Sequence, residues 1–470
     1  MFRFFSRTSK ESQYESDEEF FLKLRQKEFS RIDTAGHVYL DFTGGNLYPQ
    51  SLVLQHQTML LNQVLGNPHS SNPTSHFATE KVEEARAAVL RYFGAEDYTC
   101  IFTPNASGAL KIVGESYPFD ENSVFILTAD NHNSVNGIRD FCTKKGGQTH
   151  YVPVQYEDLM IPEAMLKESL ARFNDKTNKL FAFPAQSNVS GVKHDLKWIA
   201  AAQQKGFDVL LDAAAFVPSS RLDLSVVKPD FVSVSFYKIF GYPTGIGCLL
   251  VRNSTLEKLV KPWFAGGTVT LVSVASQSRF LASGHERFED GTINYTELPA
   301  IKLGLEFIQS IGIERINQHV LTAVEYLANR LRESKHSNGA PMVKIFGPYD
   351  FSRRGGNIIL NILDPDGRAF SFQLVEEAAN ARKISIRTGC FCNPGIDEIN
   401  NCLSNNELAT YFTSRDCGNY YDMIAFLGKM RGAIRVSVGL ATVKADLDAF
   451  LRFVASYSDK NASGTVSGEK

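Results

Sequence analysis

Several features that mark other classes of protein are weak or missing in these 470 residues. The formal net charge is only −2 at pH 7, so no positive excess favours nucleic acid or an anionic membrane surface. The longest apolar runs have the length of a strand, which excludes a membrane-spanning helix. The seven cysteines are odd in number and scattered, unlike the dense, even framework of a small disulfide-linked domain. This pattern indicates a reducing compartment.

The N-terminal stretch also lacks the features of a targeting segment. MFRFFSRTSKESQYESDEEF is aromatic and then acidic, with no apolar run of signal-peptide length and too many acidic residues for a transit peptide. Hydrophobic residues make up 43% and charged residues 21% of the chain, which is typical of a soluble globular protein with a sizeable core. We therefore expect a cytoplasmic protein.

Short apolar runs alternate with helical patterns along the first 300 residues. The runs are rich in β-branched or aromatic residues and are bounded by Gly, Pro, Asn or Asp, which is typical of buried strands. Helical patterns at 80–94, 106–117 and 195–206 lie between them. This alternation predicts an α/β fold with a mostly parallel sheet that is covered on both faces. The predicted strands lie within 98–105, 123–130, 179–185, 207–215, 230–236 and 247–253.

The pattern changes after residue 293. Long helical stretches at 295–312 and near 315–336 lead to the strand-like segments VKIFGP, NIILNIL and ISIRTGC, as expected of a smaller α+β domain. The last residues are small and polar. We predict an N-terminal lead-in over 1–30, a large domain over 31–300, a small α+β domain over 301–456 and a disordered tail over 457–470.

Side chains that follow parallel strands meet at one edge of the sheet, where ligands bind. The small-residue loop at 103–108, TPNASG, opens a predicted helix and offers backbone N–H groups to an anion such as phosphate, although such residues are also ordinary helix caps. Two other strands are followed by His132 and Asp212, which taken singly are structural or capping residues. A third is followed by Gln186, Ser187 and Asn188.

Lys238 follows the predicted strand FVSVSF in apolar surroundings, although lysine is rarely fully buried. It is either a snorkelling charge or an amine of lowered pKa that acts as a nucleophile. Together with Asp212, His132 and the TPNAS loop, it completes the set that pyridoxal phosphate requires. That set is a Schiff-base lysine, an acid for the pyridine nitrogen, a stacking aromatic and a phosphate cradle.

Two cysteines and two arginines stand out in the C-terminal part. Cys390 and Cys392 in RTGCFCNPG have poor spacing for zinc without a second Cys/His pair, and we predict no metal site. A reactive thiol on a mobile loop beside Arg387 fits better, the alternative being two ordinary cysteines. Arg435 lies inside the apolar strand GAIRVSVG and requires an anion, for which a substrate carboxylate is a natural partner.

Many motifs occur in the order found in one known family. The chain resembles the class V aminotransferase-fold enzymes and, within them, the cysteine desulfurase-like domain of molybdenum cofactor sulfurases, from about residue 30 to 456. GNPHS, FYKIFGYPTG and RTGCFCN favour the sulfurase branch. The other markers are YLDFTGGN, FTPNASGALK, DNHNSVNGIRD, FPAQSNVSGVKHDL, LLDAAAFVPSSRLDLS, FAGGTV, RFEDGTINY and IRVSVG.

The resemblance implies a homodimeric enzyme of the fold type I class that uses pyridoxal 5'-phosphate, with a seven-stranded type of sheet in its large domain. It implies that Lys238 carries the cofactor, that Asp212 pairs with its pyridine nitrogen and that His132 stacks on its ring. The residues implied around the phosphate are Ala106, Ser107, Ser235 and Tyr237, with Thr292 reaching the phosphate of the other subunit.

For the reaction, the resemblance implies a cysteine desulfurase. Asn188 would lie near the ring hydroxyl or the substrate carboxylate, and Arg435, with Arg387 nearby, would bind the carboxylate of L-cysteine. Cys392 rather than Cys390 would take the sulfur as a persulfide, with release of alanine. The sulfur would then pass to an acceptor protein or to the molybdenum cofactor.

Some features depart from the family pattern. TPNAS stands where the family usually has a TAGST-like loop, and Ala215 stands where relatives often have glutamine. Molybdenum cofactor sulfurases usually carry a further C-terminal domain that binds the molybdenum cofactor, and we expect this chain to correspond to the desulfurase part alone.

Two other functions remain open from the sequence. One is a pyridoxal phosphate-dependent amino acid lyase or C–C bond-forming enzyme of small-molecule biosynthesis. The other is a scaffold that binds partners without turnover. Cys392 beside Arg387 favours sulfur chemistry, because a plain lyase requires no loop thiol. The set of Lys238, Asp212 and His132 argues against the scaffold.

Overall fold

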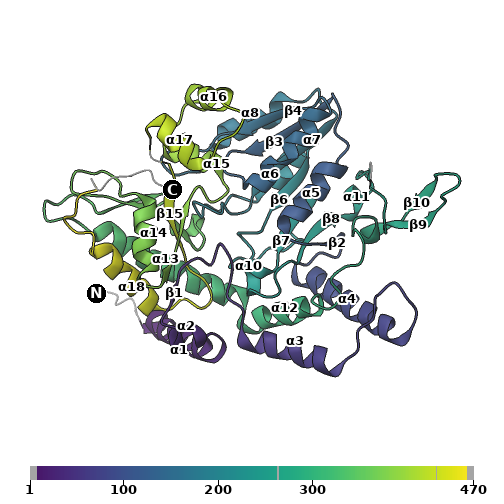
Figure 1. Ribbon diagram of the computed structural model, residues 1–470, viewed down its shortest axis with the longest axis horizontal. Helices are drawn as coiled ribbons and strands as arrows, with labels where there is room; N and C mark the ends of the chain where they lie inside the picture. The colour runs from purple at the N-terminus through teal and green to yellow at the C-terminus, as the bar shows by residue number, and fades with distance from the viewer. Residues whose placement is uncertain (1–7, 262–263, 430, 463–470) are drawn as a thin grey trace, which may run out of the picture.

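The computed structural model describes residues 8–261, 264–429 and 431–462. Its centre is a seven-stranded sheet in the order β2-β8-β7-β6-β5-β3-β4 (Figure 1). Every neighbouring pair in this sheet is parallel except those of β8, which runs antiparallel to β2 and β7. The strands are β2 (Tyr98–Thr103), β3 (Ser123–Thr128), β4 (Gln148–Val152), β5 (Asn178–Pro184), β6 (Asp208–Asp212), β7 (Phe231–Ser235) and β8 (Gly247–Arg252).

The predicted mostly parallel sheet is confirmed, and six of its strands lie where the apolar runs placed them. The strand that the sequence did not indicate is β4, QTHYV, at the edge of the sheet. Only Val152 of β4 is fully buried. An edge strand does not require a continuous apolar run, so β4 gave no such signal.

Helices cover both faces of this sheet. In β3, Val124 and Ile126 pack into one core cluster while Phe125 and Leu127 pack into another, and all four are fully buried. Because side chains alternate along a strand, this arrangement requires apolar cover on both sides. The helices from α1 to α12 are α1 (Thr8–Glu28), α2 (Arg31–Thr34), α3 (Gln50–Asn62), α4 (Pro73–Tyr92), α5 (Ala106–Ser116), α6 (Asn133–Asn136), α7 (Ile138–Lys144), α8 (Glu163–Arg172), α9 (Lys197–Gln203), α10 (Tyr237–Phe240), α11 (Asn253–Leu256) and α12 (Pro299–Ile311).

The start of α4 shows how local sequence sets a boundary. The sequence predicted this helix from residue 80, whereas it begins at Pro73. Asn72 caps it by accepting a hydrogen bond from the Ser75 N–H, and proline at the first helical position is already in the required conformation. Among the described residues, no helix is both long and apolar enough to cross a membrane.

A second, four-stranded sheet lies beside the large one, in the order β11-β12-β15-β14 with every pair antiparallel. Figure 1 shows it with α13, α14 and α18 on the left of the molecule. Its strands are β11 (Val343–Phe346), β12 (Asn357–Ile362), β14 (Arg387–Gly389) and β15 (Ala433–Ser437). The later helices are α13 (Ile313–Glu333), α14 (Phe372–Asn380), α15 (Pro394–Asn400), α16 (Asn405–Thr413), α17 (Tyr420–Leu427) and α18 (Lys444–Ala455), with short 3₁₀ turns η1 (Gly284–Arg287) and η2 (Phe351–Arg353).

The N-terminal part of the chain joins this smaller sheet. Strand β1 (Val38–Tyr39) pairs in parallel with β13 (Ile384–Ser385), and Asp41 forms a bridge to Ser437. Helix α1 docks on α18 through Arg25, whose Nη1 lies 2.6 Å from Oδ2 of Asp446. Residues that open the predicted large domain therefore lie against the C-terminal segment.

The predicted tail over 457–470 lies only partly within the described residues. Up to residue 462 it is docked: Oδ1 of Asp459 accepts a hydrogen bond from the Ser337 N–H at 2.9 Å, and the Ala462 N–H donates to Asp364 at 3.1 Å. Residues 463–470 lie outside the described part of the chain.

Candidate active site

Lys238 lies in α10, directly after β7, and is only partly exposed. Gly241 ends this short helix in the left-handed conformation, at φ 80°. A Cβ on Gly241 would lie 2.4 Å from the Tyr48 backbone nitrogen, so glycine is required for the chain to turn here. Burial lowers the pKa of Lys238, and the charge of Asp212 opposes this shift. The Lys238 amine therefore loses its proton more readily than the amine of an exposed lysine.

Asp212 ends β6 and is buried. Its Oδ1 accepts hydrogen bonds from Ser233 Oγ at 2.9 Å and from the Ala214 N–H at 3.1 Å. Within the described residues, its Oδ2 has no hydrogen-bond partner. The carboxylate is thus fixed by one oxygen and leaves the other for a cationic or N–H partner.

His132 caps α6, and its Nδ1 accepts a hydrogen bond from the Ser134 N–H at 3.1 Å. Burial lowers the pKa of His132; Asp212 opposes the shift, while Lys238 and Arg435 add to it. The ring is therefore neutral at physiological pH and is suited to stacking on an aromatic ligand. His132 follows β3, Asp212 ends β6 and Lys238 follows β7, so all three lie at the edge formed by the carboxyl ends of these parallel strands.

The N-terminus of α5 brings together three of the residues predicted around a phosphate. The Ala106 N–H donates to Ser235 Oγ at 2.8 Å, and Ser107 Oγ lies 2.6 Å from Ser134 Oγ. Asn105 caps the helix by accepting from the Gly108 N–H at 3.0 Å. Ser134 also belongs to this hydroxyl cluster; it stands in the motif DNHNSVNGIRD but was not predicted near the phosphate.

Among the described residues, the side chains of Tyr237 and Thr292 form no hydrogen bond with this cluster. Burial raises the pKa of Tyr237; the charge of Arg387 opposes this shift and that of Asp41 adds to it. Thr292 is exposed, and among the described residues no hydrogen bond joins it to the cluster.

The loop after β14 holds Cys392 against this cluster. Phe391 and Cys392 both have left-handed backbone conformations, at φ 56° and 54°. The Asn133 N–H donates to the Cys392 carbonyl oxygen at 2.7 Å, which ties the loop to the start of α6. The Phe391 ring is buried, with the Arg435 guanidinium carbon 5.1 Å from its centroid.

Asn188, predicted near the ring hydroxyl or the substrate carboxylate, bonds through its side chain to the loop that holds Cys392. Its Nδ2 donates to the Phe391 carbonyl oxygen at 2.9 Å, and its Oδ1 accepts from Asn393 Nδ2 at 3.0 Å. Asn393 also donates to the Asp130 carbonyl oxygen at 2.7 Å. The Asn188 amide is thus committed to the Cys392 loop. Neither Phe391 nor Asn393 was singled out from the sequence, because each acts through backbone or amide contacts that no motif spacing reveals.

The two thiols of the loop differ in environment. Cys392 is exposed, whereas Cys390 is partly buried and its burial raises the pKa of its thiol. Within the described residues, no group of three or more His, Cys, Asp or Glu side chains could hold a metal ion.

Arg435 and Arg387 lie opposite each other on β15 and β14. A substrate carboxylate was the predicted anion for Arg435, and in the structure the side chain that pairs with Arg435 is Asp41. Oδ1 of Asp41 accepts from Arg435 Nη2 at 2.7 Å, and its Oδ2 accepts from Arg387 Nε at 3.0 Å. Burial lowers the pKa of Arg435, and Asp41 opposes this shift. Asp41 belongs to the motif YLDFTGGN. The only sequence signal for its role was that an acidic residue follows two apolar residues.

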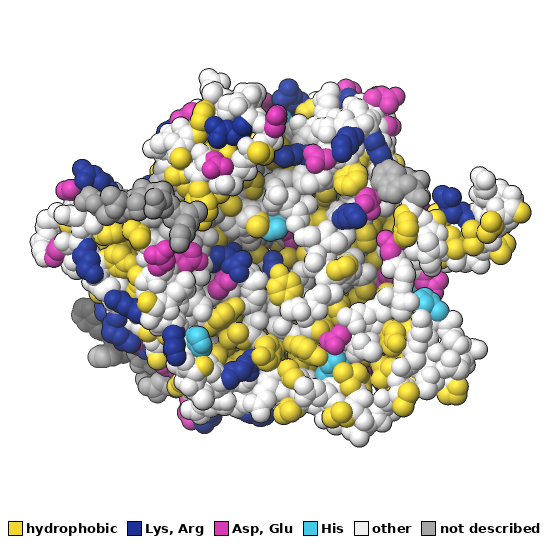
Figure 2. Space-filling model, in the orientation of Figure 1, with side chains coloured by type: hydrophobic (Ala, Val, Ile, Leu, Met, Phe, Trp, Pro, Cys, Tyr) yellow, Lys and Arg dark blue, Asp and Glu magenta, His cyan; other side chains and the backbone are white. Residues whose placement is uncertain are grey.

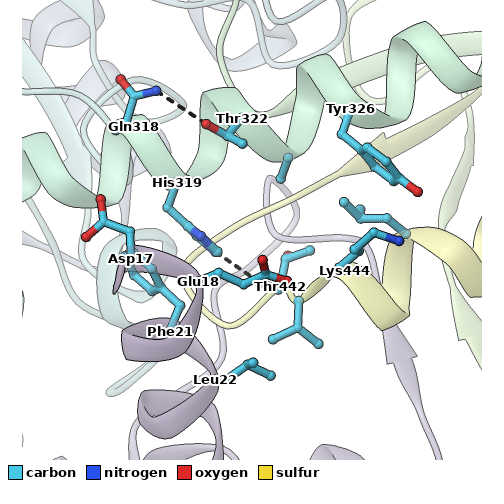
Figure 3. Close-up of a pocket in the computed structure, with 13 residues that line it drawn as sticks. Asp17, Glu18, Phe21, Leu22, Gln318, His319, Thr322, Tyr326, Thr442 and Lys444 are labelled. Atoms are coloured by element: carbon cyan, nitrogen blue, oxygen red, sulfur yellow. Dashed lines mark hydrogen bonds between the residues drawn. The ribbon is translucent and has the colours of Figure 1, made fainter. Parts of the chain in front are cut away.

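A well-formed hollow of about 560 Å³ lies away from this cluster, between α1, α13 and α18. Figure 3 shows Phe21, His319 and Thr442 around it, with a hydrogen bond of 2.9 Å between His319 Nε2 and the Thr442 carbonyl oxygen. None of its described lining residues belongs to the predicted site. The chemistry described above is therefore concentrated at the edge of the large sheet.

Several known proteins are similar to this chain in sequence. Residues 38–450 match the family model of class V aminotransferases. Among curated proteins, the molybdenum cofactor sulfurase of Bos taurus is 38% identical over 92% of this chain and 51% of its own length. That of Arabidopsis thaliana is 33% identical over 94% of this chain and 59% of its own length. The chain thus spans little more than half the length of these relatives.

Solved structures show the same fold. An apo cysteine desulfurase from Thermococcus onnurineus NA1 superposes with a TM-score of 0.76 and 22% identity, over 92% of this chain and 97% of that one. A cysteine desulfurase from Escherichia coli has a TM-score of 0.73 and 19% identity, over 93% of this chain and 98% of that one. The predicted fold and the resemblance seen in the sequence are both confirmed. The chain belongs to the class V aminotransferase family.

Proposed function

We propose that this protein is a pyridoxal phosphate-dependent cysteine desulfurase that transfers the sulfur of L-cysteine to Cys392 and releases alanine. The observation that carries the proposal is the position of Cys392, an exposed thiol whose loop is hydrogen-bonded to Asn133, the residue after His132, at the 2.7 Å contact described above. The curated relatives described above are molybdenum cofactor sulfurases, which supports sulfur transfer as the purpose of this thiol.

The residues fit the cofactor. Lys238 would carry it, the unpartnered Oδ2 of Asp212 would accept the pyridine N–H, and the neutral His132 ring would stack on it. The helix N-terminus at Ala106 and the nearby serine hydroxyls would hold the phosphate. When bound, the cofactor supplies an electron sink that weakens the bonds at the α and β carbons of an amino acid.

The chain itself then has three tasks. Arg435 would orient the carboxylate of L-cysteine, and Lys238 Nζ would move protons at the α carbon. The Cys392 thiolate would attack the substrate sulfur, forming an S–S bond as the C–S bond breaks. L-cysteine and one thiol thus yield alanine and one persulfide, with no net gain or loss of atoms or electrons. The alternative acceptor thiol, Cys390, is disfavoured because burial raises its pKa.

The sulfur acceptor and the dimer are further parts of the proposal. The names of the relatives indicate the molybdenum cofactor as the final acceptor, reached directly or through an acceptor protein. The hairpin of β9 (Val269–Val272) and β10 (Arg279–Leu281) projects from the body in Figure 1. A second copy of the chain would cover this hairpin.

This hairpin carries exposed apolar side chains, which Figure 2 shows on the right of the molecule. Val274 is 92% exposed and Phe280 is 68% exposed, which is unfavourable for a segment surrounded by water. Thr292 follows the hairpin in the chain and would reach the cofactor phosphate of the second copy. Light scattering of the wild type should give a dimer, and Phe280→Asp should give a monomer with less bound cofactor. A wild-type monomer would contradict this part.

The function is tested by incubating the cofactor-loaded protein with L-cysteine and measuring alanine and protein-bound persulfide. We expect both products from the wild type and from Cys390→Ser, and neither from Cys392→Ser. Alanine formation that survives in Cys392→Ser would overturn the persulfide mechanism. Pyruvate and free sulfide in place of alanine and persulfide would identify a lyase. Unchanged L-cysteine in the presence of bound cofactor would support the scaffold.

A further inference from the structure

Arg387 and Arg435 place two positive charges directly opposite each other on antiparallel strands. Like charges in this arrangement destabilise a sheet unless an anion lies between them. Asp41 supplies that anion, because each of its two oxygens pairs with one of the arginines. The predicted binding site for the substrate carboxylate thus already contains a carboxylate from the chain itself.

The donors of Arg435 show what this means for a substrate. Its Nη1 donates to the Asn188 carbonyl oxygen at 2.9 Å, its Nη2 is held by Asp41, and its Nε is buried without a partner. A carboxylate that binds an arginine side-on requires Nε and Nη2 together. Nε has no partner among the described residues, whereas Nη2 already donates to Asp41. An incoming carboxylate can therefore bind fully only when Asp41 gives up Nη2.

The surroundings of Asp41 allow that exchange without leaving its charge unpaired. Its Oδ2 lies 2.8 Å from Arg387 Nη2 in addition to the contact with Nε, so two donors of Arg387 hold it independently of Arg435. The Arg387 side chain is 51% exposed, whereas that of Arg435 is 3% exposed. A Cβ on Gly44 would lie 2.4 Å from Oδ2 of Asp41, so glycine leaves the room in which the carboxylate is held.

We propose that Asp41 is an internal counter-ion that occupies Arg435 until the carboxylate of an amino acid replaces it, and that Asp41 then remains on Arg387. This inference rests on the proposed function only in taking Arg435 as the carboxylate-binding residue. Asp41 is a positioning residue that does not touch the reacting atoms. Its competition reduces the apparent affinity for every ligand that carries a carboxylate, because only the fraction of molecules with Arg435 released binds fully.

The test compares Asp41→Asn with the wild type in two titrations of the cofactor-loaded protein, followed by cofactor absorbance and by calorimetry. L-alanine carries a carboxylate and has no sulfur to transfer, and ethylamine is the same molecule without the carboxylate. We expect the dissociation constant of L-alanine to fall about tenfold in Asp41→Asn while that of ethylamine stays the same. The melting temperature should fall, because two arginines lose their shared anion.

Weaker or unchanged binding of L-alanine by Asp41→Asn would overturn the inference, since a purely structural role predicts that result. Asp41→Ser carries the same expectation and is used if Asp41→Asn does not fold. Asp446→Asn is the matched control, because Asp446 pairs with buried Arg25 at 2.6 Å away from the site. It should lower the melting temperature without changing the ratio of the two dissociation constants.

The outcome is separable from that of the proposed function. Neither ligand requires sulfur transfer, so the ratio can change in a protein that makes no persulfide. In that case Asp41 still competes with ligand carboxylates for Arg435, and the enzyme catalyses a reaction other than sulfur transfer. A protein that makes alanine and persulfide but shows no change in the ratio would contradict the inference alone.

Discussion

The side-chain amide of Asn188 donates a hydrogen bond of 2.9 Å to the carbonyl oxygen of Phe391, which joins the loop after β5 to the loop that holds Cys392. Phe391 and the neighbouring Cys392 are non-glycine residues in the left-handed region, a conformation that costs about 1–3 kcal/mol each. Contacts from outside the loop must hold this conformation. The side-chain amide of Asn188 supplies one of these contacts, through its hydrogen bond to the Phe391 backbone.

We predict that Asn188→Ala releases the Cys392 loop. Loss of the bond to Phe391 leaves the left-handed conformation with less support, so the loop should leave the sheet edge more often. Alkylation of Cys392 by iodoacetamide should become at least about threefold faster, and alanine formation should fall by about tenfold. Peptide mass spectrometry over time measures the alkylation rate of each cysteine separately.

The control for this experiment is Asn317→Ala. Asn317 also donates a side-chain hydrogen bond to a backbone carbonyl, that of Ser219 at 2.6 Å, but lies on α13. It should leave the Cys392 rate unchanged. If Asn188→Ala lowers activity without changing the alkylation rate, Asn188 acts on the cofactor or substrate, as the sequence analysis expected, and does not hold the loop.

The cysteines themselves should react in a defined order. Because burial raises the pKa of Cys390, its thiolate is scarce at pH 7.5 and its side chain is partly shielded. We expect iodoacetamide to modify the exposed Cys392, Cys402 and Cys417 first. Raising the pH to 9 should accelerate the reaction of Cys390, since its thiolate fraction then rises. Reaction of Cys390 ahead of Cys392 at pH 7.5 would contradict the assignment of the two thiols.

Sequence reasoning could place Lys238, Asp212 and His132 in one group because a single rule applies to all of them. Side chains after the strands of a parallel sheet meet at one edge, and buried strands are readable as apolar runs. The edge strand β4 had no such run, and the sequence did not indicate it.

The partners of the arginines were not predictable in the same way. Asp41 and Arg435 are separated by 394 residues, and their contact depends on β1 pairing with β13. A two-residue strand leaves no periodic signal, so nothing in the sequence indicated which acid meets Arg435. The predicted role of Thr292 depends on a second copy of the chain, and the pattern of strands within one chain does not place it.

A glycine in α12 should be needed for the turn that carries Lys238. A Cβ on Gly304 would lie 2.3 Å from the Phe240 ring, and Phe240 ends α10 two residues after Lys238. Alanine is the better helix former by about 1 kcal/mol, but overpacking against a fixed ring costs about 1–3 kcal/mol. Gly304→Ala should therefore lower the melting temperature and the amount of bound cofactor, measured by calorimetry and absorbance.

Gly137→Ala is the matched control. Gly137 has an ordinary φ of −58°, and a Cβ there would make its closest contact at 3.5 Å. This variant should be as stable as the wild type or slightly more stable, because alanine reduces the freedom of the unfolded chain. Equal stability of the two variants would show that Phe240 moves aside, and that α12 does not fix the position of α10.

The partly buried His319 should make the protein sensitive to acid. Burial lowers the pKa of His319 to about 4, with the carbonyl of Thr442 opposing the shift, and its ring stacks on Phe21 with centroids 3.8 Å apart. The unfolded chain binds this proton from about pH 6.5 downward, whereas the folded protein binds it only near pH 4. Stability from this group is therefore complete above pH 6.5 and is lost as the pH falls, by about 2 kcal/mol at pH 5.

His319→Gln keeps an N–H donor for the Thr442 carbonyl oxygen but cannot take up the proton, so it should be less stable than the wild type at pH 7 and lose less stability between pH 7 and pH 5. Urea unfolding at both pH values measures the difference. His76→Gln serves as the control, because the His76 side chain is 68% exposed and its removal should leave the pH dependence unchanged. If His319→Gln loses as much stability as the wild type on acidification, another group takes up the proton, and the packing of α1 on α13 through Phe21 does not depend on a neutral His319.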